Sequence, residues 1–135
     1  MARIKAGSEN QSGKVKSIDP INYGLKPVLF SLEKVQSGKF GFDQLDRDDK
    51  GFFSEAMFKR KDLTWNEIQQ NGRHSLGMEK INRSSIRTGI PNFITEDVSS
   101  FQAFRFKAKA PMVGYREKDV FFVLWFDPTF ELYKH

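Results

Sequence analysis

Hydrophobic and polar residues follow a strand-like pattern in the C-terminal third of the chain, where we expect three consecutive β-strands joined by tight turns. Residues 104–107 alternate two phenylalanines with an arginine and a lysine, which places apolar groups on one face of a strand and cations on the other. Pro111 interrupts the pattern, and a short second strand is expected over residues 112–116. Residues 120–126 are all apolar, which is typical of an interior strand covered on both faces.

The middle of the chain predicts one early strand and two helices. Residues 28–35 place apolar side chains at every second position and predict a strand, and residues 39–42 could add a short return strand after a Ser-Gly turn. Residues 52–61 have the amphipathic pattern of a helix. A Thr-Trp-Asn-Glu capping box at Thr64 then predicts a second helix, over residues 65–70.

The remaining stretches are polar and irregular. Residues 1–26 contain few apolar side chains and several cations, so we expect a flexible basic arm. Residues 82–100 read as one long connection, a kind of loop that is often functional in a small domain. We therefore predict a single α+β domain over residues 27–135. It is a twisted antiparallel sheet of four to five strands with two short helices packed on one face.

Composition narrows the classes of function. The net charge of +5 favours polyanionic partners, nucleic acid first, although mildly basic domains without such partners are equally common. The chain contains no cysteine, which removes disulfides and thiolate metal sites and is typical of a reducing compartment. No apolar stretch is long enough to cross a membrane, and the N-terminal region has no apolar signal-peptide core. We expect a cytoplasmic protein that does not interact with membranes.

Familiar catalytic motifs are absent from the sequence, which has no glycine-rich phosphate loop, no paired-histidine metal spacing and no GxSxG. A metal site of His74, His135 and Glu79 has little support because the two histidines lie far apart in the sequence, so we expect neither a metal nor a cofactor. Cations do recur beside aromatic and imidazole groups. Neighbouring strands lie about 4.8 Å apart, so the groups on such strands could converge on one patch.

A phosphate-cleaving site needs cations to hold the anion and a titratable group to move a proton. The candidate catalytic residues are His74, Arg105, Arg116, Tyr133 and His135. The candidate nucleic-acid-binding residues are Arg73, Lys80, Lys107, Lys109 and Tyr115. The same residues also fit a solvated sheet face with ordinary ion pairs, such as Arg116 with Glu117.

The order of a strand, two helices and three strands resembles the RelE/ParE-like toxin superfamily, and FRFKAKAPMVGYREKDVFFVLWFD resembles that superfamily's terminal strands. The chain also resembles bacterial and phage proteins that end in a near match to PMVGYREKDVFFVLWFDPTFELYKH and carry RHSLGMEKI upstream, a likeness that brings no activity with it. The first resemblance implies a RelE-like fold. It also matches Arg105 and Arg116 to the strand arginines of the RNA-cleaving members, and Tyr133 or His135 to their late proton-transfer group.

The resemblance implies a toxin-like protein that acts on RNA or the ribosome, as a metal-independent endoribonuclease in a toxin–antitoxin or phage-related system. An antitoxin protein would be its partner. The pair of lysines that the superfamily carries on its second helix is missing here, and the connection over residues 82–100 is longer. Two alternatives remain: a non-catalytic module that binds nucleic acid or protein, and a ParE-like toxin directed at DNA gyrase.

Overall fold

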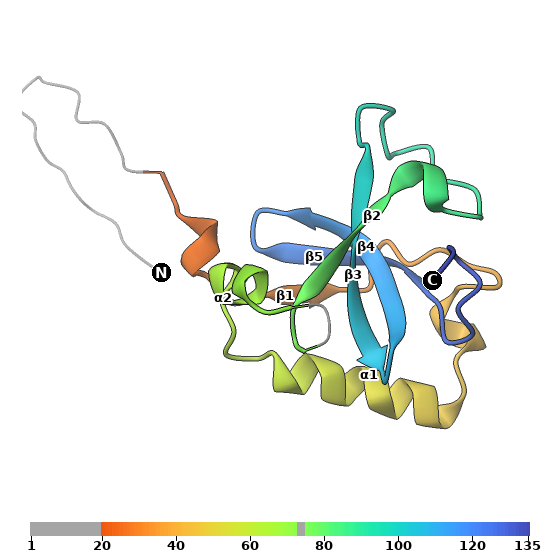
Figure 1. The fold of residues 1–135 in the computed structure, drawn as a ribbon, viewed down its shortest axis with the longest axis horizontal. Helices are drawn as coiled ribbons and strands as arrows, with labels where there is room; N and C mark the ends of the chain where they lie inside the picture. The colour runs from red at the N-terminus through yellow and green to blue at the C-terminus, as the bar shows by residue number, and fades with distance from the viewer. Residues whose placement is uncertain (1–19, 73–74) are drawn as a thin grey trace, which may run out of the picture.

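A mixed five-stranded sheet forms the centre of the protein, which we describe from a computed structural model over residues 20–72 and 75–135 (Figure 1). The strand order across the sheet is β1-β5-β4-β3-β2. The strands are β1 (Leu29–Ser31), β2 (Met78–Asn82), β3 (Ser100–Lys107), β4 (Ala110–Glu117) and β5 (Val120–Phe126). The predicted α+β class is confirmed.

The direction of β1 departs from the prediction of a wholly antiparallel sheet. Strands β2 to β5 pair antiparallel in sequence order, whereas β1 pairs parallel with β5, with Phe30 opposite Phe121. Tight turns force the C-terminal strands to run antiparallel. Both helices and strands β2 to β4 separate β1 from β5 in the sequence, so the local pattern leaves the direction of β1 open.

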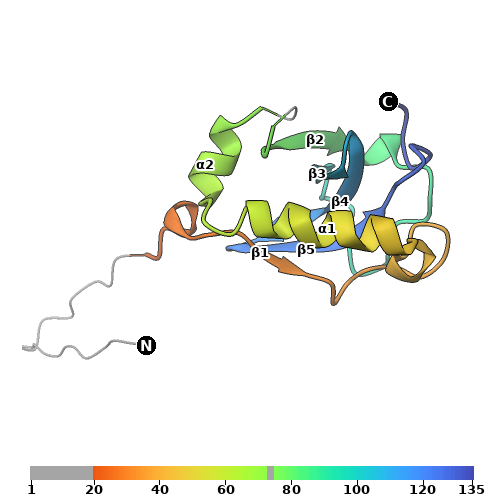
Figure 2. The same ribbon diagram turned by 90° about the horizontal axis from the view of Figure 1, so that it is seen from below.

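Two α-helices contribute to one face of the sheet, as predicted. The first, α1 (Arg47–Lys59), begins five residues before the predicted start, because Asp46 caps it by accepting from the Asp49 N–H at 2.7 Å. The second, α2 (Trp65–Gln70), has the predicted bounds and the complete capping box. In Figure 2, α1 lies across the near side of the sheet, and α2 stands beside one end of the sheet.

Strand boundaries differ from the prediction where a side-chain pattern is short. Strand β1 is shorter than residues 28–35, and residues 39–42 form a turn leading into the 3₁₀ helix Phe42–Gln44 rather than a strand. Pro111 does not interrupt the sheet but lies inside β4, opposite the irregular register between Arg105 and Lys107. A bulge is a position where a strand tolerates a residue with no N–H to donate.

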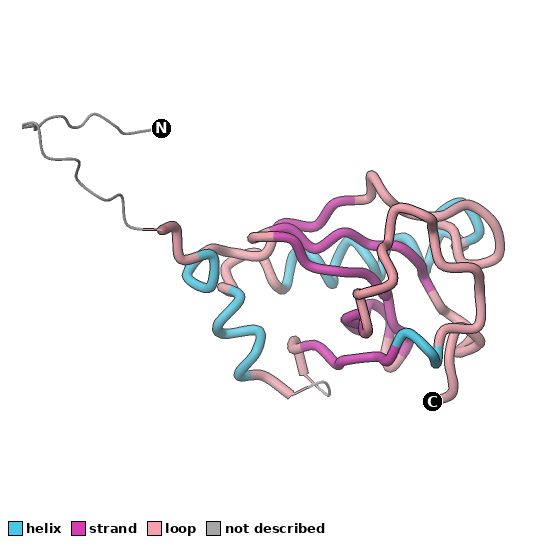
Figure 3. The backbone as a smooth tube through the Cα atoms, turned by 90° about the horizontal axis from the view of Figure 1, so that it is seen from above, coloured by secondary structure: helices cyan, strands magenta, loops and turns pink. Residues whose placement is uncertain are grey.

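Two hydrophobic clusters cover the two faces of the sheet. The first includes Phe53 and Ala56 of α1, Trp65 and Ile68 of α2, and Phe104, Phe106, Met112 and Phe121 of the sheet. The second includes Ile81, Phe101, Ala103, Val113, Leu124, Trp125, Leu132 and Tyr133. Loops rather than helices contribute the rest of the second cluster, and Figure 3 shows them over the half of the molecule that carries the C-terminus. Functional side chains from the loops can therefore meet the strands on this loop face.

Residues 23–26, which the prediction assigns to the N-terminal arm, contact α2. The 3₁₀ helix Tyr23–Leu25 contacts α2, and the Trp65 N–H donates to the Lys26 carbonyl at 3.1 Å. The predicted arm otherwise falls on residues 1–19, which lie outside the described residues. Within residues 20–72 and 75–135, every helix is too short or too polar to span a membrane.

Candidate functional site

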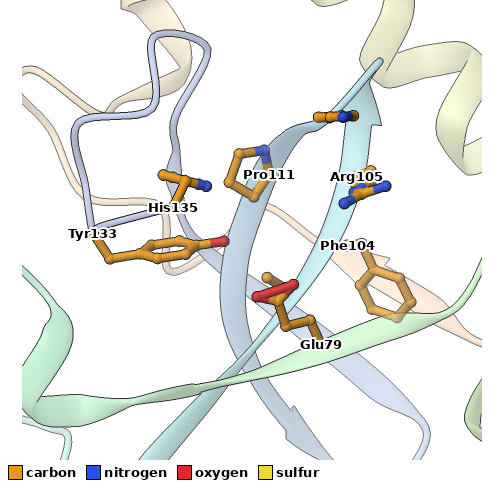
Figure 4. A pocket seen from close by; sticks show the side chains of 8 residues that line it. Glu79, Phe104, Arg105, Pro111, Tyr133 and His135 are labelled. Carbon is orange, nitrogen blue, oxygen red and sulfur yellow. The ribbon is translucent and has the colours of Figure 1, made fainter. Parts of the chain in front are cut away.

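A polar pocket opens on the loop face of the sheet, at the end where β3 turns into β4 (Figure 4). Its cavity volume is about 30 Å³. Its lining residues come from β2, β3, β4, the β3–β4 turn and the C-terminal tail: Glu79, Ala103, Phe104, Arg105, Lys109, Pro111, Tyr133 and His135. Four titratable groups besides the glutamate are therefore brought together from segments far apart in the chain.

His135 is held in the pocket wall by a buried carboxylate. Its Nε2 lies 3.3 Å from Oδ2 of Asp127, which is fully buried. The same carboxylate accepts from the backbone N–H groups of Glu131 at 2.8 Å and Leu132 at 2.9 Å. With Nε2 donating to Asp127, the Nδ1 nitrogen keeps a lone pair and can accept a proton. About a quarter of the His135 side chain is exposed, so solvent and substrate can reach it.

Aromatic rings fix the plane of the imidazole. His135 stacks on Tyr133, with ring centroids 4.1 Å apart, and meets the edge of Phe130 at 4.9 Å. Phe130 adopts a left-handed backbone conformation, with φ of 62°, where the tail folds back over Asp127. In Figure 4 the Tyr133 hydroxyl points into the pocket, and the side chains of Glu79 and Arg105 lie on its far side.

Arg60 lies behind the pocket as a buried positive charge. Its guanidinium donates to the carbonyls of Ala56 at 2.9 Å, Leu76 at 2.9 Å and Arg105 at 3.2 Å, and its side chain packs over the ring of Phe104. Burial lowers the pKa of Arg60 to about 10, so it remains charged at neutral pH. Arg60 thus ties α1, the segment before β2 and β3 together beneath the pocket.

The structure brings together Arg105, Lys109, Tyr133 and His135 of the predicted site residues, but it places Arg116 elsewhere. Arg116 lies over the ring of Trp65 on the helix face, 4.2 Å from the ring centroid. The expectation that both strand arginines share one patch is therefore wrong. The β3–β4 register explains this, because Arg105 pairs with Pro111, and Arg116 is an odd number of residues further along β4.

Three predicted nucleic-acid contacts lie away from the pocket. Lys107 forms an ion pair with Asp49 of α1, with Nζ and Oδ1 2.6 Å apart, and this hydrogen bond raises the pKa of Lys107. Lys80 is exposed on the edge strand β2, one residue from Glu79 and so on the other face. Tyr115 is half-buried on the loop face and stacks on Phe122.

Two predicted site residues, Arg73 and His74, lie outside the described residues. The metal site weighed for His74, His135 and Glu79 therefore has one member without a described position. Among residues 20–72 and 75–135, no three His, Asp or Glu side chains are grouped closely enough to hold a metal ion.

The sequence analysis named neither Asp127 nor Glu79 among the catalytic or nucleic-acid-binding residues, and weighed Glu79 only as a metal ligand with His74 and His135. The position of Asp127, eight residues before His135, is nevertheless a usable signal. A tail of that length can fold back and return an imidazole to a buried carboxylate. The place of Glu79 beside Arg105 had no such signal, because β2 was not predicted as a strand.

The chain was compared with protein-family models, curated proteins and solved structures, and it matches none of them. The resemblance to RelE-like toxins therefore stays a prediction.

Proposed function

We propose that the protein acts on RNA, and that the pocket on the loop face cleaves a phosphodiester without a metal, in the manner of a toxin-like endoribonuclease. One observation carries this proposal: Arg105, Lys109, Tyr133 and His135 line a single pocket, and Asp127 orients the imidazole. Cations that can hold a phosphate thus lie beside an imidazole that can accept and donate a proton.

In the proposed reaction, Arg105 and Lys109 hold the scissile phosphate and stabilise the charge that develops on its oxygens. Nδ1 of His135 accepts the proton of the ribose 2′-hydroxyl, and the 2′-oxygen attacks the adjacent phosphorus. The bond from phosphorus to the 5′-oxygen breaks, which leaves a 2′,3′-cyclic phosphate. Tyr133, whose hydroxyl points into the pocket, donates a proton to the leaving 5′-oxygen.

The pocket is too small to enclose a whole ligand. Its cavity volume of about 30 Å³ lies far below the range of about 300–1,000 Å³ typical of pockets that enclose drug-sized ligands, so only a small part of a substrate, such as phosphate oxygens, would enter it. Most of a polymeric substrate would lie outside it.

The same proposal includes RNA or the ribosome as partner, a cytoplasmic location and a neutralising antitoxin protein.

The test is regulated expression in bacteria with growth and total RNA followed together. Wild-type protein is expected to arrest growth and to yield RNA fragments ending in 2′,3′-cyclic phosphate, whereas Arg105→Ala and His135→Ala are expected to lose both effects. Arg47→Ala is the matched control, because Arg47 is an exposed arginine at the start of α1. Arg116→Ala, on the helix face, is expected to keep activity.

The outcome that contradicts the proposal is equally clear. If wild-type protein, Arg105→Ala and His135→Ala all leave RNA intact and growth unchanged, the pocket does not catalyse RNA cleavage. Equal loss of activity in the Arg47→Ala and Arg105→Ala variants would indicate general electrostatic binding instead of a catalytic pocket.

A further inference from the structure

Three aromatic rings and a lysine form a second feature of the loop face, which we call the aromatic platform. Tyr115 of β4 and Phe122 of β5 are paired across the strands and stacked, with ring centroids 5.2 Å apart and an interplanar angle of 18°. Phe93, from the connection between β2 and β3, lies 6.3 Å from Tyr115. The ammonium of Lys34 is 5.2 Å from the Phe93 ring centroid.

The platform is accessible. Phe93 is 47% exposed, and both Tyr115 and Phe122 are half-buried, so ring surface remains open to solvent. The exposed phenylalanine and the two partly open rings leave apolar surface in water, which is unfavourable in free energy. A bound aromatic ring would cover this surface.

The platform and the pocket lie on the same face of the sheet. Tyr115 packs against the hydrophobic cluster that contains Tyr133, and Tyr133 lines the pocket. Along β4, Tyr115 is four residues from Pro111, the strand residue in the pocket wall. At about 3.3 Å per residue this separation is about 13 Å. A single strand of a few nucleotides can span that distance.

The chemistry of the platform suits a nucleobase rather than a phosphate. Bases stack on aromatic side chains whatever their sequence, because every base has a π-face. Burial raises the pKa of Tyr115, and the nearby carboxylates of Glu117 and Glu33 raise it further. These two carboxylates disfavour a phosphate beside the rings, whereas a neutral base is not repelled. The platform has one cation, Lys34, whereas the pocket has Arg105 and Lys109 beside Glu79.

We propose that the aromatic platform of Tyr115, Phe122, Phe93 and Lys34 is a base-stacking subsite for single-stranded RNA whose backbone enters the pocket at Arg105. The inference rests on the proposed function and names its substrate class: unpaired RNA, held by stacking without base-specific hydrogen bonds. Double-stranded RNA is excluded as a substrate of this subsite, because its bases present no free face to stack.

The test measures binding of a fluorescein-labelled 2′-O-methyl hexa-adenylate to the full chain by anisotropy. Blocked 2′-hydroxyls prevent cleavage, so binding is measured independently of catalysis. Phe93→Ala is expected to weaken binding roughly 5-fold or more, since one stacked base contributes ~1–3 kcal/mol. Phe52→Ala is the matched control, because Phe52 on α1 is 46% exposed and lies away from the loop face. It is expected to bind like wild type.

A second probe replaces single adenosines with abasic residues. If a base stacks on the platform, one abasic position weakens binding to wild-type protein but not to Phe93→Ala. Equal binding by Phe93→Ala, Phe52→Ala and wild type overturns the platform and leaves the catalytic proposal standing. Absence of any binding by the wild type also overturns it. Stacking without cleavage of unmodified RNA overturns only the catalytic proposal.

Discussion

Replacing Asp127 with asparagine tests the most buried ionisable group of the site. The substitution keeps the size of the side chain but turns one acceptor oxygen into an NH₂ donor. Both oxygens of Asp127 accept in the native protein, one from the Glu131 N–H and the other from the Leu132 N–H and the His135 ring. Whichever way the amide is oriented, one backbone N–H faces a donor: the buried N–H of Leu132 or the partly buried N–H of Glu131.

The magnitude follows from these contacts. A hydrogen bond to a charged group contributes about 1.5–3 kcal/mol, and a buried donor left without an acceptor costs a similar amount. We therefore expect Asp127→Asn to lower the free energy of unfolding by about 2–4 kcal/mol. With an unfolding entropy of about 2.1 cal/mol/K per residue, the chain of 135 residues would lose about 7–14 °C in Tm.

Urea unfolding followed by tryptophan fluorescence measures this loss, since Trp65 and Trp125 are both buried. Asp62→Asn is the matched control, because the Asp62 side chain is 85% exposed and pairs with the neighbouring Lys61 in a surface contact of 2.7 Å. If Asp127→Asn and Asp62→Asn unfold at the same urea concentration, the buried carboxylate does not hold the C-terminal tail, and the orientation of His135 must have another cause.

Other positions give sharp expectations. Arg60→Met should lower the free energy of unfolding by about 2–4 kcal/mol, because three carbonyls lose their donor, and Arg60→Lys should recover part of this in the same urea assay. Gly114→Ala should not yield folded protein by circular dichroism, since a Cβ at that position overlaps a backbone carbonyl of β5. Gly51 lies in α1 with open space around it, so Gly51→Ala should raise the free energy of unfolding by about 0.5–1 kcal/mol. Thr64→Ala should cost about 1 kcal/mol through loss of the α2 cap, as measured by thermal melting. Tyr115 should ionise above pH 10 in a titration followed by tyrosinate absorbance. The difference between the wild-type and Tyr115→Phe titrations gives the contribution of Tyr115. Because the unfolded chain loses that proton first, the Tyr115 contribution to stability should fall as the pH rises above 10; equal ionisation in folded and urea-unfolded protein would contradict this.

The sequence alone was sufficient where one local pattern decides the structure. The capping box at Thr64 and Glu67 satisfies its own backbone donors, so α2 begins where the residues say it does. The apolar run over residues 120–126 has no polar alternative and forms β5 with those bounds, between β1 and β4. Alternation placed Phe104 and Phe106 in the core and left Arg105 and Lys107 partly exposed.

Long-range pairing decided what the sequence left open. The register of β3 on β4 determines that Arg105 faces the pocket while Arg116 faces Trp65, and a shift of β4 by one residue would place both arginines on the same face. The parallel direction of β1 and the identification of β2 as an edge strand depend on partners far away in the chain. The pairing of Asp127 with His135 required the tail to fold back. Local patterns determine which residues are buried, whereas register and chain reversal, which depend on the whole fold, determine which polar groups meet.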